Sequence, residues 1–587
     1  MPLFPKNELA QFLIASLVAN NVEHVVISPG SRNAPLIIGF SNHPSIKTYS
    51  IVDERSAAFF ALGMAQQLKK PVAIVCTSGS ALLNYYPAVA EAFYSNIPLV
   101  VVSADRPKHL IEIGDGQTIN QKYVFQNHIL YSANLKLDLK DEKNIPVTED
   151  LPIMKNLEDK LERFLGFQKN IQTHNEIEIN TSINTAFIEK GPVHINIPFD
   201  EPLYETVDKQ SIETKNTDVI LKEKPVDSYA LQECFEYWNS ATKKMILVGV
   251  NQPNQIEQKW LDDIAKDDSV IVFTETTSNL HDDSFFPSID QIIAPLTQED
   301  QIDLQPEILL TFGGMIVSKK IKSFLRKYQP KHHWHIDKKK AYDTFFCLSM
   351  HVEATPNQFF ESLLPKITHY VKSDYKETWM AVKEKRLEKH KLYLKQIPFC
   401  DFKVFDSILK SIPNYSILQV GNSSAIRYTQ LFSVNKTLEV YCNRGTSGID
   451  GSTSTAVGFS VVSKKRTVFI TGDLSFLYDS NGLWNNYIPN NFRIIVVNNQ
   501  GGGIFRILPG QKDTKNFDTF FETKHDLNAK HLSKMYSIDY LSAKTDQQLK
   551  NKLENFYSES YRPKLLEIFT PRIINDEVLL KYFEFLV

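Results

Sequence analysis

Long hydrophobic runs, clustered cysteines and an excess of basic residues are all missing from this chain of 587 residues. No apolar run approaches the roughly 18 residues of a membrane-spanning helix, and the N-terminus has no basic segment followed by an apolar one. The five cysteines lie far apart without CxxC or CxxH spacing, which excludes a disulfide framework and a zinc site of that kind. We therefore expect a cytoplasmic protein without an integral membrane segment.

The charge and the nucleotide motifs exclude further classes. A net charge of −3 gives no basic surface for nucleic acid, so we expect no nucleic-acid partner. No GxxxxGK[ST] appears, and no GxGxxG follows a strand within 227–370, which disfavours a generic nucleotide-binding protein. An apolar content of 42% in 587 residues is typical of a globular protein with two to four domains.

Short runs of Val and Ile alternate with helical segments along most of the chain. Continuous apolar strands separated by helices indicate parallel sheets covered on both faces. The predicted strands lie at 23–29, 48–53, 71–79, 97–105, 191–203, 245–250, 269–275, 307–314, 332–337, 415–423, 438–444, 466–473, 492–503 and 564–569. We expect an α/β protein of three successive domains with mostly parallel sheets, over 1–204, 227–370 and 371–587, with a polar linker over 205–226.

Unusual residues gather where two strands of the third domain end. Strand 466–473 ends in Gly-Asp at Asp473, and strand 492–503 carries Asn499 and three glycines at its end. Open α/β sheets bind ligands at the carboxyl ends of adjacent parallel strands, so Asp473 and Asn499 should present two oxygens to one point. Such oxygens suit Mg²⁺, and Gly501 can add a backbone carbonyl. On shape alone, a helix cap followed by a glycine-rich loop explains the same residues.

Two other segments carry polar side chains in regular positions. SPGSRNAPL (28–36) places Ser31, Arg32 and Asn33 in one tight turn between a strand and a helix, where an ordinary α/β turn does not require them. HHWHID puts His333 and His335 on one strand face, as two metal ligands would lie. No third ligand is evident nearby, so we interpret the histidines as part of a strand and the turn as a ligand site.

The strand–Gly-Asp–helix–strand–Asn-Asn arrangement resembles the diphosphate-binding motif of thiamine diphosphate enzymes. That resemblance implies a glutamate in a separate α/β domain, beside the pyrimidine ring of the cofactor. Glu54 is the candidate, because it lies at the end of a strand and the start of a helix. Taken alone, Glu54 would be interpreted as a first-turn carboxylate that stabilises the helix dipole, and the second motif reverses that interpretation.

A series of motifs in the first and third domains narrows the resemblance. Together they resemble the family of 2-succinyl-5-enolpyruvyl-6-hydroxy-3-cyclohexene-1-carboxylate synthases of menaquinone biosynthesis. The motifs are SPGSRNAPL (28–36), VDERSAAFFALG (52–63), TSGSALLNYYPAVAEA (77–92), SADRP (103–107), GDGQTINQ (114–121), GNSSAIR (421–427), NRGTSGIDG (443–451) and GDLSFLYD (472–479). Leu474 supports this branch, because other thiamine enzymes usually have glycine there. The resemblance is weak in the central domain.

The resemblance implies a transferase that uses thiamine diphosphate with Mg²⁺ or Mn²⁺. It would decarboxylate 2-oxoglutarate and add the resulting succinyl-semialdehyde carbanion to isochorismate by conjugate (1,4-) addition. The implied catalytic residues are Glu54, which favours the imino tautomer of the pyrimidine, with Gln117 and Arg32 at the reacting region. Domain 1–204 would be the pyrimidine-binding domain and 371–587 the diphosphate-binding domain.

Two dianionic substrates require several cations or strong donors, and arginine suits bidentate carboxylate binding. The implied substrate-binding residues are Ser31, Arg32, Arg106, Lys319, Ser423, Arg427 and Arg444. The implied cofactor-binding residues are Glu54, Ser447, Ile449, Asp473, Leu474, Ser475, Asn499, Gly501, Ile504 and Phe505, of which Asp473, Asn499 and Gly501 would hold the metal. The resemblance also implies a homodimer or homotetramer with the active site between chains.

The sequence departs from the family at two positions. Lys320 lies where some members have arginine, and Gly116 lies where some have asparagine, so their contacts would be lost or supplied from elsewhere. Two classes of alternative remain open at this point. The chain could be another thiamine diphosphate decarboxylase or carboligase, or a catalytically silent homologue, although a silent homologue has no need of Glu54.

Overall fold

The computed structural model describes residues 3–111, 113–137, 157–212, 224–367, 370–507, 514 and 516–587, with side chains of helix α6 from residue 170 on. Part of the predicted linker, 213–223, lies outside the described residues. The chain forms two compact units. Unit 1 comprises Met1–Leu221, Asp450–Lys464 and Asp479–Pro489, and unit 2 comprises Lys222–Ile449, Lys465–Tyr478 and Asn490–Val587.

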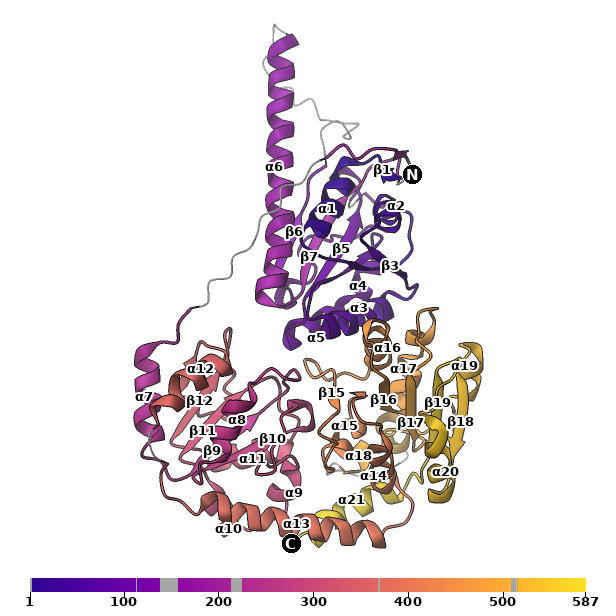
Figure 1. The fold of residues 1–587 in the computed structure, drawn as a ribbon. Coiled ribbons are helices and arrows are strands. Elements are labelled where there is room, and N and C mark those ends of the chain that lie inside the picture. The colour runs from indigo at the N-terminus through magenta and orange to yellow at the C-terminus, as the bar shows by residue number, and fades with distance from the viewer. Residues whose placement is uncertain are drawn as a thin grey trace. The chain divides into compact units, whose positions relative to one another are not determined.

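Unit 1 is built on a six-stranded parallel sheet (Figure 1). In spatial order its strands are β3 (Lys47–Ser50), β2 (His24–Ile27), β4 (Val72–Cys76), β5 (Leu99–Asp105), β7 (Val193–Pro198) and β6 (Tyr131–Asn134). Its helices are α1 (Glu8–Ala19), α2 (Ala34–Asn42), α3 (Glu54–Leu68), α4 (Ser80–Asn84), α5 (Tyr86–Ser95), α6 (Leu157–Glu189) and α16 (Ser452–Val462). Side chains of α1, α2 and α6 share one hydrophobic core with one face of the sheet. A two-stranded antiparallel pair, β1 (Phe4–Pro5) and β8 (Thr206–Val207), completes the unit.

Unit 2 contains two further parallel sheets. The middle sheet runs in the order β10 (Val270–Thr274), β9 (Lys244–Val248), β11 (Ile308–Phe312), β12 (His332–Ile336) and β13 (Met350–Val352). The third sheet runs in the order β15 (Glu439–Tyr441), β14 (Ile417–Val420), β16 (Thr467–Gly472), β17 (Arg493–Asn498), β19 (Lys564–Phe569) and β18 (Asp539–Ala543). Helices lie between these strands in the sequence, which gives each sheet its parallel crossovers.

The helices of unit 2 divide between its two sheets. Those that accompany the middle sheet are α7 (Ser228–Trp238), α8 (Gln258–Ala265), α9 (Ile289–Ile293), α10 (Gln298–Leu304), α11 (Lys319–Lys327), α12 (Pro356–Leu363) and α13 (Tyr375–Gln396). Those of the third sheet are α14 (Asp401–Ser411), α15 (Ser424–Thr429), α17 (Asp473–Tyr478), α18 (Ile504–Ile507), α19 (Lys530–Met535), α20 (Asp546–Phe556) and α21 (Ile574–Phe585). The prediction of three α/β domains with parallel sheets is therefore confirmed.

The first and third sheets share one topology. Counted along each sheet, the strands lie in the order 2-1-3-4-6-5, and the middle sheet in the order 2-1-3-4-5. In such sheets the chain changes direction between the first and third strands, and ligands bind outside the carboxyl ends at that point. The switch points lie between β2 and β4, between β9 and β11, and between β14 and β16.

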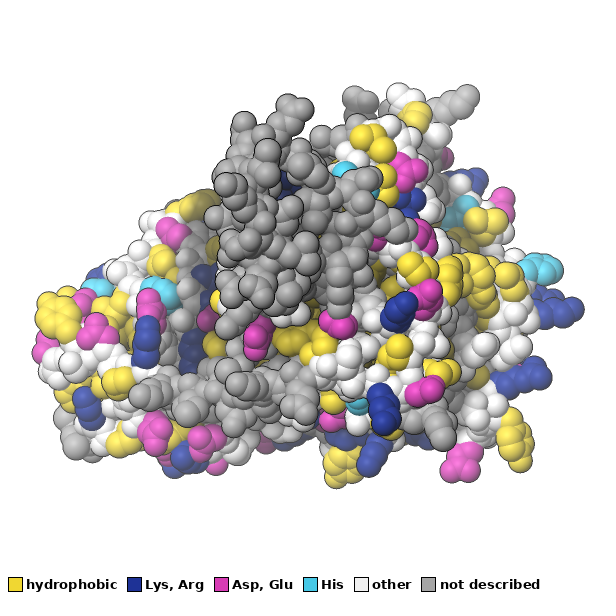
Figure 2. Space-filling view, turned by 90° about the horizontal axis from the view of Figure 1, so that it is seen from above, with side chains coloured by type: hydrophobic (Ala, Val, Ile, Leu, Met, Phe, Trp, Pro, Cys, Tyr) yellow, Lys and Arg dark blue, Asp and Glu magenta, His cyan; other side chains and the backbone are white. Residues whose placement is uncertain are grey.

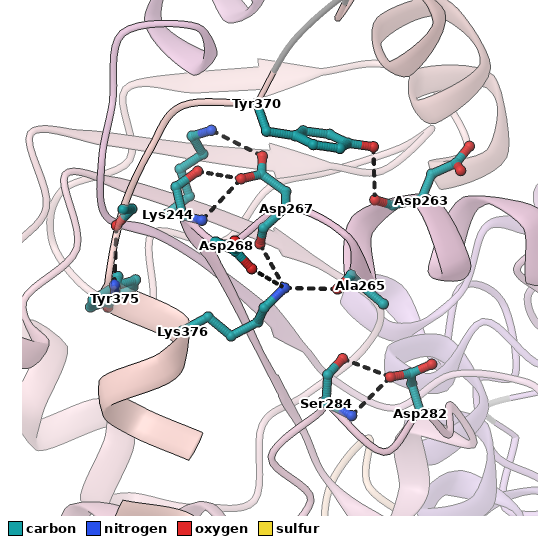
Figure 3. A network of polar contacts seen from close by, with 12 residues as sticks. Lys244, Asp263, Ala265, Asp267, Asp268, Asp282, Ser284, Tyr370, Tyr375 and Lys376 are labelled. Atoms are coloured by element: carbon teal, nitrogen blue, oxygen red, sulfur yellow. Dashed lines mark hydrogen bonds and ion pairs between the residues drawn. The ribbon is translucent and has the colours of Figure 1, made fainter. Parts of the chain in front are cut away.

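The amino-terminal end of the middle sheet holds a dense polar network (Figure 3). Lys244, the first residue of β9, pairs with Asp267 at 3.2 Å, and both side chains are buried. Lys376 of α13 donates to the carbonyl oxygens of Ala265 and Asp267 at 2.7 and 3.0 Å. The network fastens α13 to the turn that precedes β10, at the end of the sheet opposite its carboxyl edge.

The distribution of surface charge and the polarity of the helices match the low net charge and the lack of long apolar runs in the sequence. On the face shown in Figure 2, basic and acidic side chains are interspersed over the described surface. Within the described residues, every helix is too short or too polar to cross a membrane.

Candidate active site

The carboxyl edge of the third sheet brings Asp473 and Asn499 together. Strands β16 and β17 pair in parallel with Gly472 opposite Val497, so that Asp473 and Asn499 follow directly beyond the last paired residues. Asp473 is 4% exposed and Asn499 is 7% exposed. The sequence prediction that these two side chains share an edge agrees with this register.

Three groups surround the Asp473 carboxylate. Its Oδ1 accepts a hydrogen bond from the backbone N–H of Leu474 at 2.7 Å, and its Oδ2 accepts one from the N–H of Gly501 at 3.0 Å. His525 Nε2 lies 3.3 Å from the same Oδ2, and this contact raises the pKa of His525. The carboxylate thus fixes the start of α17 and the glycine loop after β17 at one place.

The side-chain amide of Asn499 is satisfied on one side only. Its Nδ2 donates to Asp401 Oδ2 at 2.9 Å. Its Oδ1 is buried and has no hydrogen-bond partner among the described residues. A buried acceptor without a partner lowers the stability of the fold unless a ligand pairs with it. A bound cation or hydrogen-bond donor would satisfy this oxygen.

Gly501 occupies a backbone conformation that other residues avoid. Its φ is +149°, and a Cβ atom there would lie 2.7 Å from the carbonyl oxygen of Glu522. That oxygen accepts a hydrogen bond from the N–H of Gly502 at 2.6 Å. Glycine is therefore required where the loop approaches both Asp473 and the segment around Glu522.

The other predicted cofactor residues of unit 2 flank this edge. Ser475 is buried, and its hydroxyl donates to the carbonyl oxygen of Ile449 at 3.0 Å. Ser447 precedes Ile449 with a φ of +62°. Ile504 and Phe505 begin α18 just beyond the glycine loop, and Phe505 is 37% exposed.

Predicted substrate residues also lie at the ends of β14 and β15. Asn422 connects the two loops, because its Nδ2 donates to the carbonyl oxygens of Asn443 and Gly448, both at 2.7 Å. Its Oδ1 accepts a hydrogen bond from Arg444 at 2.7 Å. Ser423 precedes α15 with a φ of +65°, and its side chain makes no capping hydrogen bond to the helix. This arrangement fixes Arg444 beside the start of the helix that carries Arg427.

Arg427 and Arg444 lie near a buried carboxylate of the middle domain. Burial, followed by the proximity of Arg444, lowers the pKa of Arg427. Glu275 is 3% exposed and follows β10, and burial raises its pKa to about 7 despite the hydrogen bonds from Val317 and Ser318 and the charge of Arg444. The two guanidinium groups therefore belong to one electrostatic cluster with Glu275.

Lys319 lies at the start of α11, which Glu275 holds. The backbone N–H groups of Val317 and Ser318 donate to the Glu275 carboxylate at 2.8 and 2.7 Å. Lys319 and Lys320 are exposed at this helix end. The Lys320 ammonium lies 5.5 Å from the ring centroid of Phe583, a contact that differs from the bidentate binding of an arginine.

In unit 1, the turn after β2 places Arg32 as a partly buried cation. Arg32 donates to the carbonyl oxygen of Phe199 at 3.1 Å and lies 3.3 Å from Glu201. Burial and the nearby charge of Arg106 lower its pKa. Asn33 donates to the Ser28 carbonyl oxygen at 3.0 Å, so it shapes the turn, whereas Ser31 is exposed.

Arg106 follows β5 and organises the loop that contains Gln117. Its Nε donates to Asp115 at 2.7 Å, and one terminal nitrogen donates to Ser78 Oγ at 2.9 Å and to the Gln117 carbonyl oxygen at 3.2 Å. Gln117 has a φ of +55° and is exposed. Gly116, where some family members have asparagine, has open space at its Cβ position.

Glu54 is the first residue of α3. Its predecessor Asp53 caps the helix by accepting a hydrogen bond from the Ser56 N–H at 3.1 Å. Asn84 donates to Glu54 Oε2 at 3.5 Å, a weak contact that leaves the carboxylate largely unengaged. The same carboxylate adds to burial in raising the pKa of Cys76, which is wholly buried.

The predicted site residues thus fall into two groups. Unit 1 brings together Arg32, Arg106 and the Gln117 loop, with Glu54 on α3. Unit 2 brings together Asp473, Asn499, Gly501, Ser475 and Ile449 at the edge of the third sheet, and Arg427 and Arg444 near Glu275. Ser423 precedes the helix that carries Arg427, and Lys319 begins α11. Sequence reasoning missed Asp401, Glu275 and His525, because no local motif marks residues that tertiary contacts bring to a site.

The histidine pair of the middle domain is accounted for by its sheet. His333 and His335 both contact Thr311 Oγ1, at 3.0 and 2.9 Å. Across the described part of the chain, no group of three or more His, Cys, Asp or Glu side chains forms a metal site. The interpretation of 332–337 as a strand is confirmed by β12.

Comparison with known families agrees with this architecture. The N-terminal TPP binding domain of thiamine pyrophosphate enzymes matches residues 7–133, the middle domain matches 214–409, and the C-terminal TPP binding domain matches 419–568. The three parallel-sheet domains and these three matches identify the chain as a thiamine pyrophosphate enzyme.

Individual relatives narrow the class. The chain is 57% identical to the 2-succinyl-5-enolpyruvyl-6-hydroxy-3-cyclohexene-1-carboxylate synthase of Christiangramia forsetii, over 99% of both chains. It is 54% identical to the synthase of Flavobacterium psychrophilum over 99% of both chains, and 36% identical to that of Porphyromonas gingivalis over 96% of this chain and 95% of the relative. The chain therefore belongs to this family of synthases, a thiamine pyrophosphate-dependent transferase family of menaquinone biosynthesis, and the resemblance identified from the motifs is confirmed.

Proposed function

We propose that the protein decarboxylates 2-oxoglutarate and adds the resulting four-carbon unit to isochorismate by conjugate addition. The observation that carries the proposal is the unpartnered Asn499 oxygen beside the Asp473 carboxylate, at the carboxyl edge of a sheet that matches a TPP binding domain. A divalent cation bound to a diphosphate would satisfy both groups, since hard cations prefer such oxygens. The residues present therefore fit thiamine diphosphate with Mg²⁺ or Mn²⁺.

Each side of the cofactor has its own residues in this proposal. Asp473, Asn499 and the Gly501 carbonyl oxygen would hold the metal and thereby the diphosphate, with Leu474 and Ser475 at the start of α17. Ile449 would support the bent cofactor, with Ser447, Ile504 and Phe505 beside it. When bound, thiamine diphosphate supplies the carbanion chemistry of the reaction.

The remaining residues bind substrates and move protons. Glu54 would exchange a proton with the pyrimidine ring, a role that suits a carboxylate whose hydrogen bond from Asn84 is as long as 3.5 Å. Ser423, Arg427, Arg444 and Lys319 would bind the carboxylates of the 2-oxoglutarate unit. Ser31, Arg32 and Arg106 would bind those of isochorismate, with Gln117 at the reacting carbon. Two converging guanidinium groups in each set match the two carboxylates of each substrate.

We also propose a homodimer or homotetramer, in which Glu54 of one chain serves a cofactor held by a second chain. Membership of the family supports this assembly. It is also supported by the division of the site residues into two groups, each of which lies in a different compact unit of this chain. Sedimentation velocity of the active protein tests the assembly, and a fully active monomer would contradict it.

The test of the reaction follows isochorismate by ultraviolet absorbance in the presence of thiamine diphosphate and Mg²⁺. Loss of isochorismate that requires 2-oxoglutarate and falls by about 10²–10⁴-fold in Glu54→Gln is the expected result, since a positioned proton-transfer group contributes about that much. Release of CO₂ from 2-oxoglutarate while isochorismate remains intact would reduce the protein to a plain decarboxylase.

A further inference from the structure

A buried carboxylate that no motif marks lies directly behind the predicted metal site. Asp401, the first residue of α14, is 2% exposed. It is 98 residues from Asn499 in the sequence, yet its Oδ2 accepts the hydrogen bond from Asn499 Nδ2 at 2.9 Å. Burial raises the pKa of Asp401 to about 6, and the nearby charge of Asp473 adds to this rise. Asp401 therefore touches the predicted metal ligand from the protein side.

Both oxygens of Asp401 are engaged by protein donors. Oδ1 accepts from the Thr570 hydroxyl at 2.5 Å, and Oδ2 accepts from Asn499. The Asp401 backbone N–H donates to Asn575 Oδ1 at 2.8 Å, so the side chain is anchored at its base as well. With one protein donor on each oxygen, Asp401 is placed to orient the Asn499 amide.

An amide side chain has one donor end and one acceptor end, whereas a carboxylate can only accept. A carboxylate facing Asn499 therefore selects the rotamer in which the amide nitrogen points toward Asp401. The amide oxygen is then directed to the opposite side, where it lies buried and without a partner. Without Asp401, the two orientations of the Asn499 amide would differ little in energy at this contact.

We propose that Asp401 is a positioning residue that fixes the Asn499 amide with its oxygen toward the divalent metal of the cofactor. This inference rests on the proposed function, because it assumes that Asn499 is a metal ligand. Partners that orient metal ligands typically change metal affinity by about 10–100-fold when they are removed.

The direct test measures Mn²⁺ binding in the presence of thiamine diphosphate, from the electron paramagnetic resonance signal of free Mn²⁺. Asp401→Asn is expected to raise the Mn²⁺ dissociation constant by about 10–100-fold, because the new amide can face Asn499 in either orientation. Thr570→Val is the matched control, since it removes the other partner of Asp401 and leaves the Asn499 contact in place. We expect it to change the dissociation constant by less than about threefold.

A double-mutant cycle separates orientation from general loss of structure. With Asn499→Asp, the carboxylate lies at position 499, and Asp401→Asn should then strengthen Mn²⁺ binding, because the amide becomes the donor to that carboxylate. This reversal of sign is not expected of a residue that only stabilises α14, whose effect would be the same in both backgrounds. It also keeps the test decisive if Asp401→Asn alone folds poorly in a thermal melt.

The results of these measurements distinguish the role of Asp401 from the presence of the metal site itself. If Asn499→Ala abolishes Mn²⁺ binding while Asp401→Asn leaves it unchanged, or if the cycle is additive, the role of Asp401 is overturned and the metal site stands. If Asn499→Ala binds Mn²⁺ as the unmodified protein does, the proposed metal site is itself wrong. A weakened single variant with a sign reversal in the cycle supports the inference.

Discussion

Two buried polar clusters of unit 2 differ in whether their polar atoms all have hydrogen-bond partners. At the amino-terminal end of the middle sheet, Asp267 is fully matched, because Oδ2 accepts from Lys244 at 3.2 Å and Oδ1 accepts from the N–H and hydroxyl of Ser269 at 3.0 and 2.5 Å. At the carboxyl end of the third sheet, Asn499 keeps a buried oxygen without a partner. A buried polar group lowers stability unless it is paired, so only the second cluster has a physical need for a ligand.

The position of each cluster along its strands leads to the same conclusion. Lys244 begins β9, whereas Asn499 follows β17, and ligands of open α/β sheets bind at the carboxyl ends. Burial of charge alone therefore does not identify a site in this molecule. What identifies it is an incompletely satisfied group at the strand end where ligands bind.

The largest expected effect comes from breaking the satisfied cluster. Lys244→Met leaves the buried Asp267 carboxylate without its cation, which should lower the free energy of unfolding by about 3–5 kcal/mol. Urea denaturation monitored by tryptophan fluorescence measures this loss. Mn²⁺ affinity measured under folding conditions should stay unchanged, because the cluster belongs to the middle sheet and the predicted metal site lies at the carboxyl edge of the third sheet.

A surface lysine of the same turn provides the control for that experiment. Lys266 pairs with Asp263 at 2.8 Å, but its side chain is 62% exposed. Lys266→Met should leave the free energy of unfolding close to that of the unmodified protein, as is usual for exposed pairs. Equal losses from the two substitutions would remove the distinction between buried and exposed pairs on which the comparison depends.

The second prediction distorts the unsatisfied cluster through its backbone. Gly501→Ala introduces a Cβ 2.7 Å from the Glu522 carbonyl oxygen at a φ of +149°, which should cost about 1–3 kcal/mol of stability. Thermal melts without cofactor measure the cost. Gly472→Ala is the matched control at the same sheet edge, since its Cβ meets no atom within 4 Å, and it should melt within about 1–2 °C of the unmodified protein.

The third prediction concerns a buried histidine in unit 1. His194 is fully buried, with Nε2 2.8 Å from Ser103 Oγ, and burial lowers its pKa to about 3. In the unfolded chain the histidine is protonated near pH 6.5, whereas in the folded protein it stays neutral down to about pH 3. The contribution of His194 to the free energy of unfolding is therefore complete above pH 6.5 and is lost as the pH falls toward 3. Between pH 6.5 and 5 the loss should be about 2 kcal/mol.

His194→Gln isolates that term, because glutamine does not titrate. The stability difference between the unmodified protein and the variant should shrink by about 2 kcal/mol from pH 6.5 to pH 5 in parallel urea titrations. A constant difference across this range would show that His194 has the same protonation behaviour in both states.

The sequence predicted the buried strands well and the edge strands poorly. Strands such as β4 and β5 are fully buried runs of Val and Ile, and their composition alone indicated a parallel sheet. Within the three parallel sheets, sequence reasoning missed β6, β13 and β18, each of which lies at the edge of its sheet and is only partly buried. An edge strand needs fewer apolar residues, so its pattern is weaker.

The site divides in the same way. Asp473, Asn499 and Arg106 were predictable because each directly follows an apolar strand, and the carboxyl end of a strand is a recognisable position in the sequence. Asp401 was not, because its role depends on a contact with a residue 98 positions away. Glu275 does follow an apolar strand, but its role depends on contacts with a segment 42 positions away that no pattern in the sequence indicates. Sequence patterns show where a strand ends, and they do not show which distant side chain is packed behind it.

The smallest expected effect concerns Arg106 of unit 1. It tests whether this side chain binds substrate or only stabilises the fold. Arg106 uses a fork of nitrogens to hold Asp115, Ser78 and the Gln117 carbonyl oxygen, which one ammonium cannot reproduce. Arg106→Lys should raise KM for isochorismate by about tenfold, or about 1.4 kcal/mol, with little change in melting temperature. Lys108→Ala, at an exposed position two residues along, should leave KM unchanged. If Arg106→Lys instead lowered the melting temperature and left KM unchanged, Arg106 would belong with Lys244 among the groups that stabilise the fold. Ser31 and Arg32 would then remain to bind the carboxylates of the acceptor in unit 1.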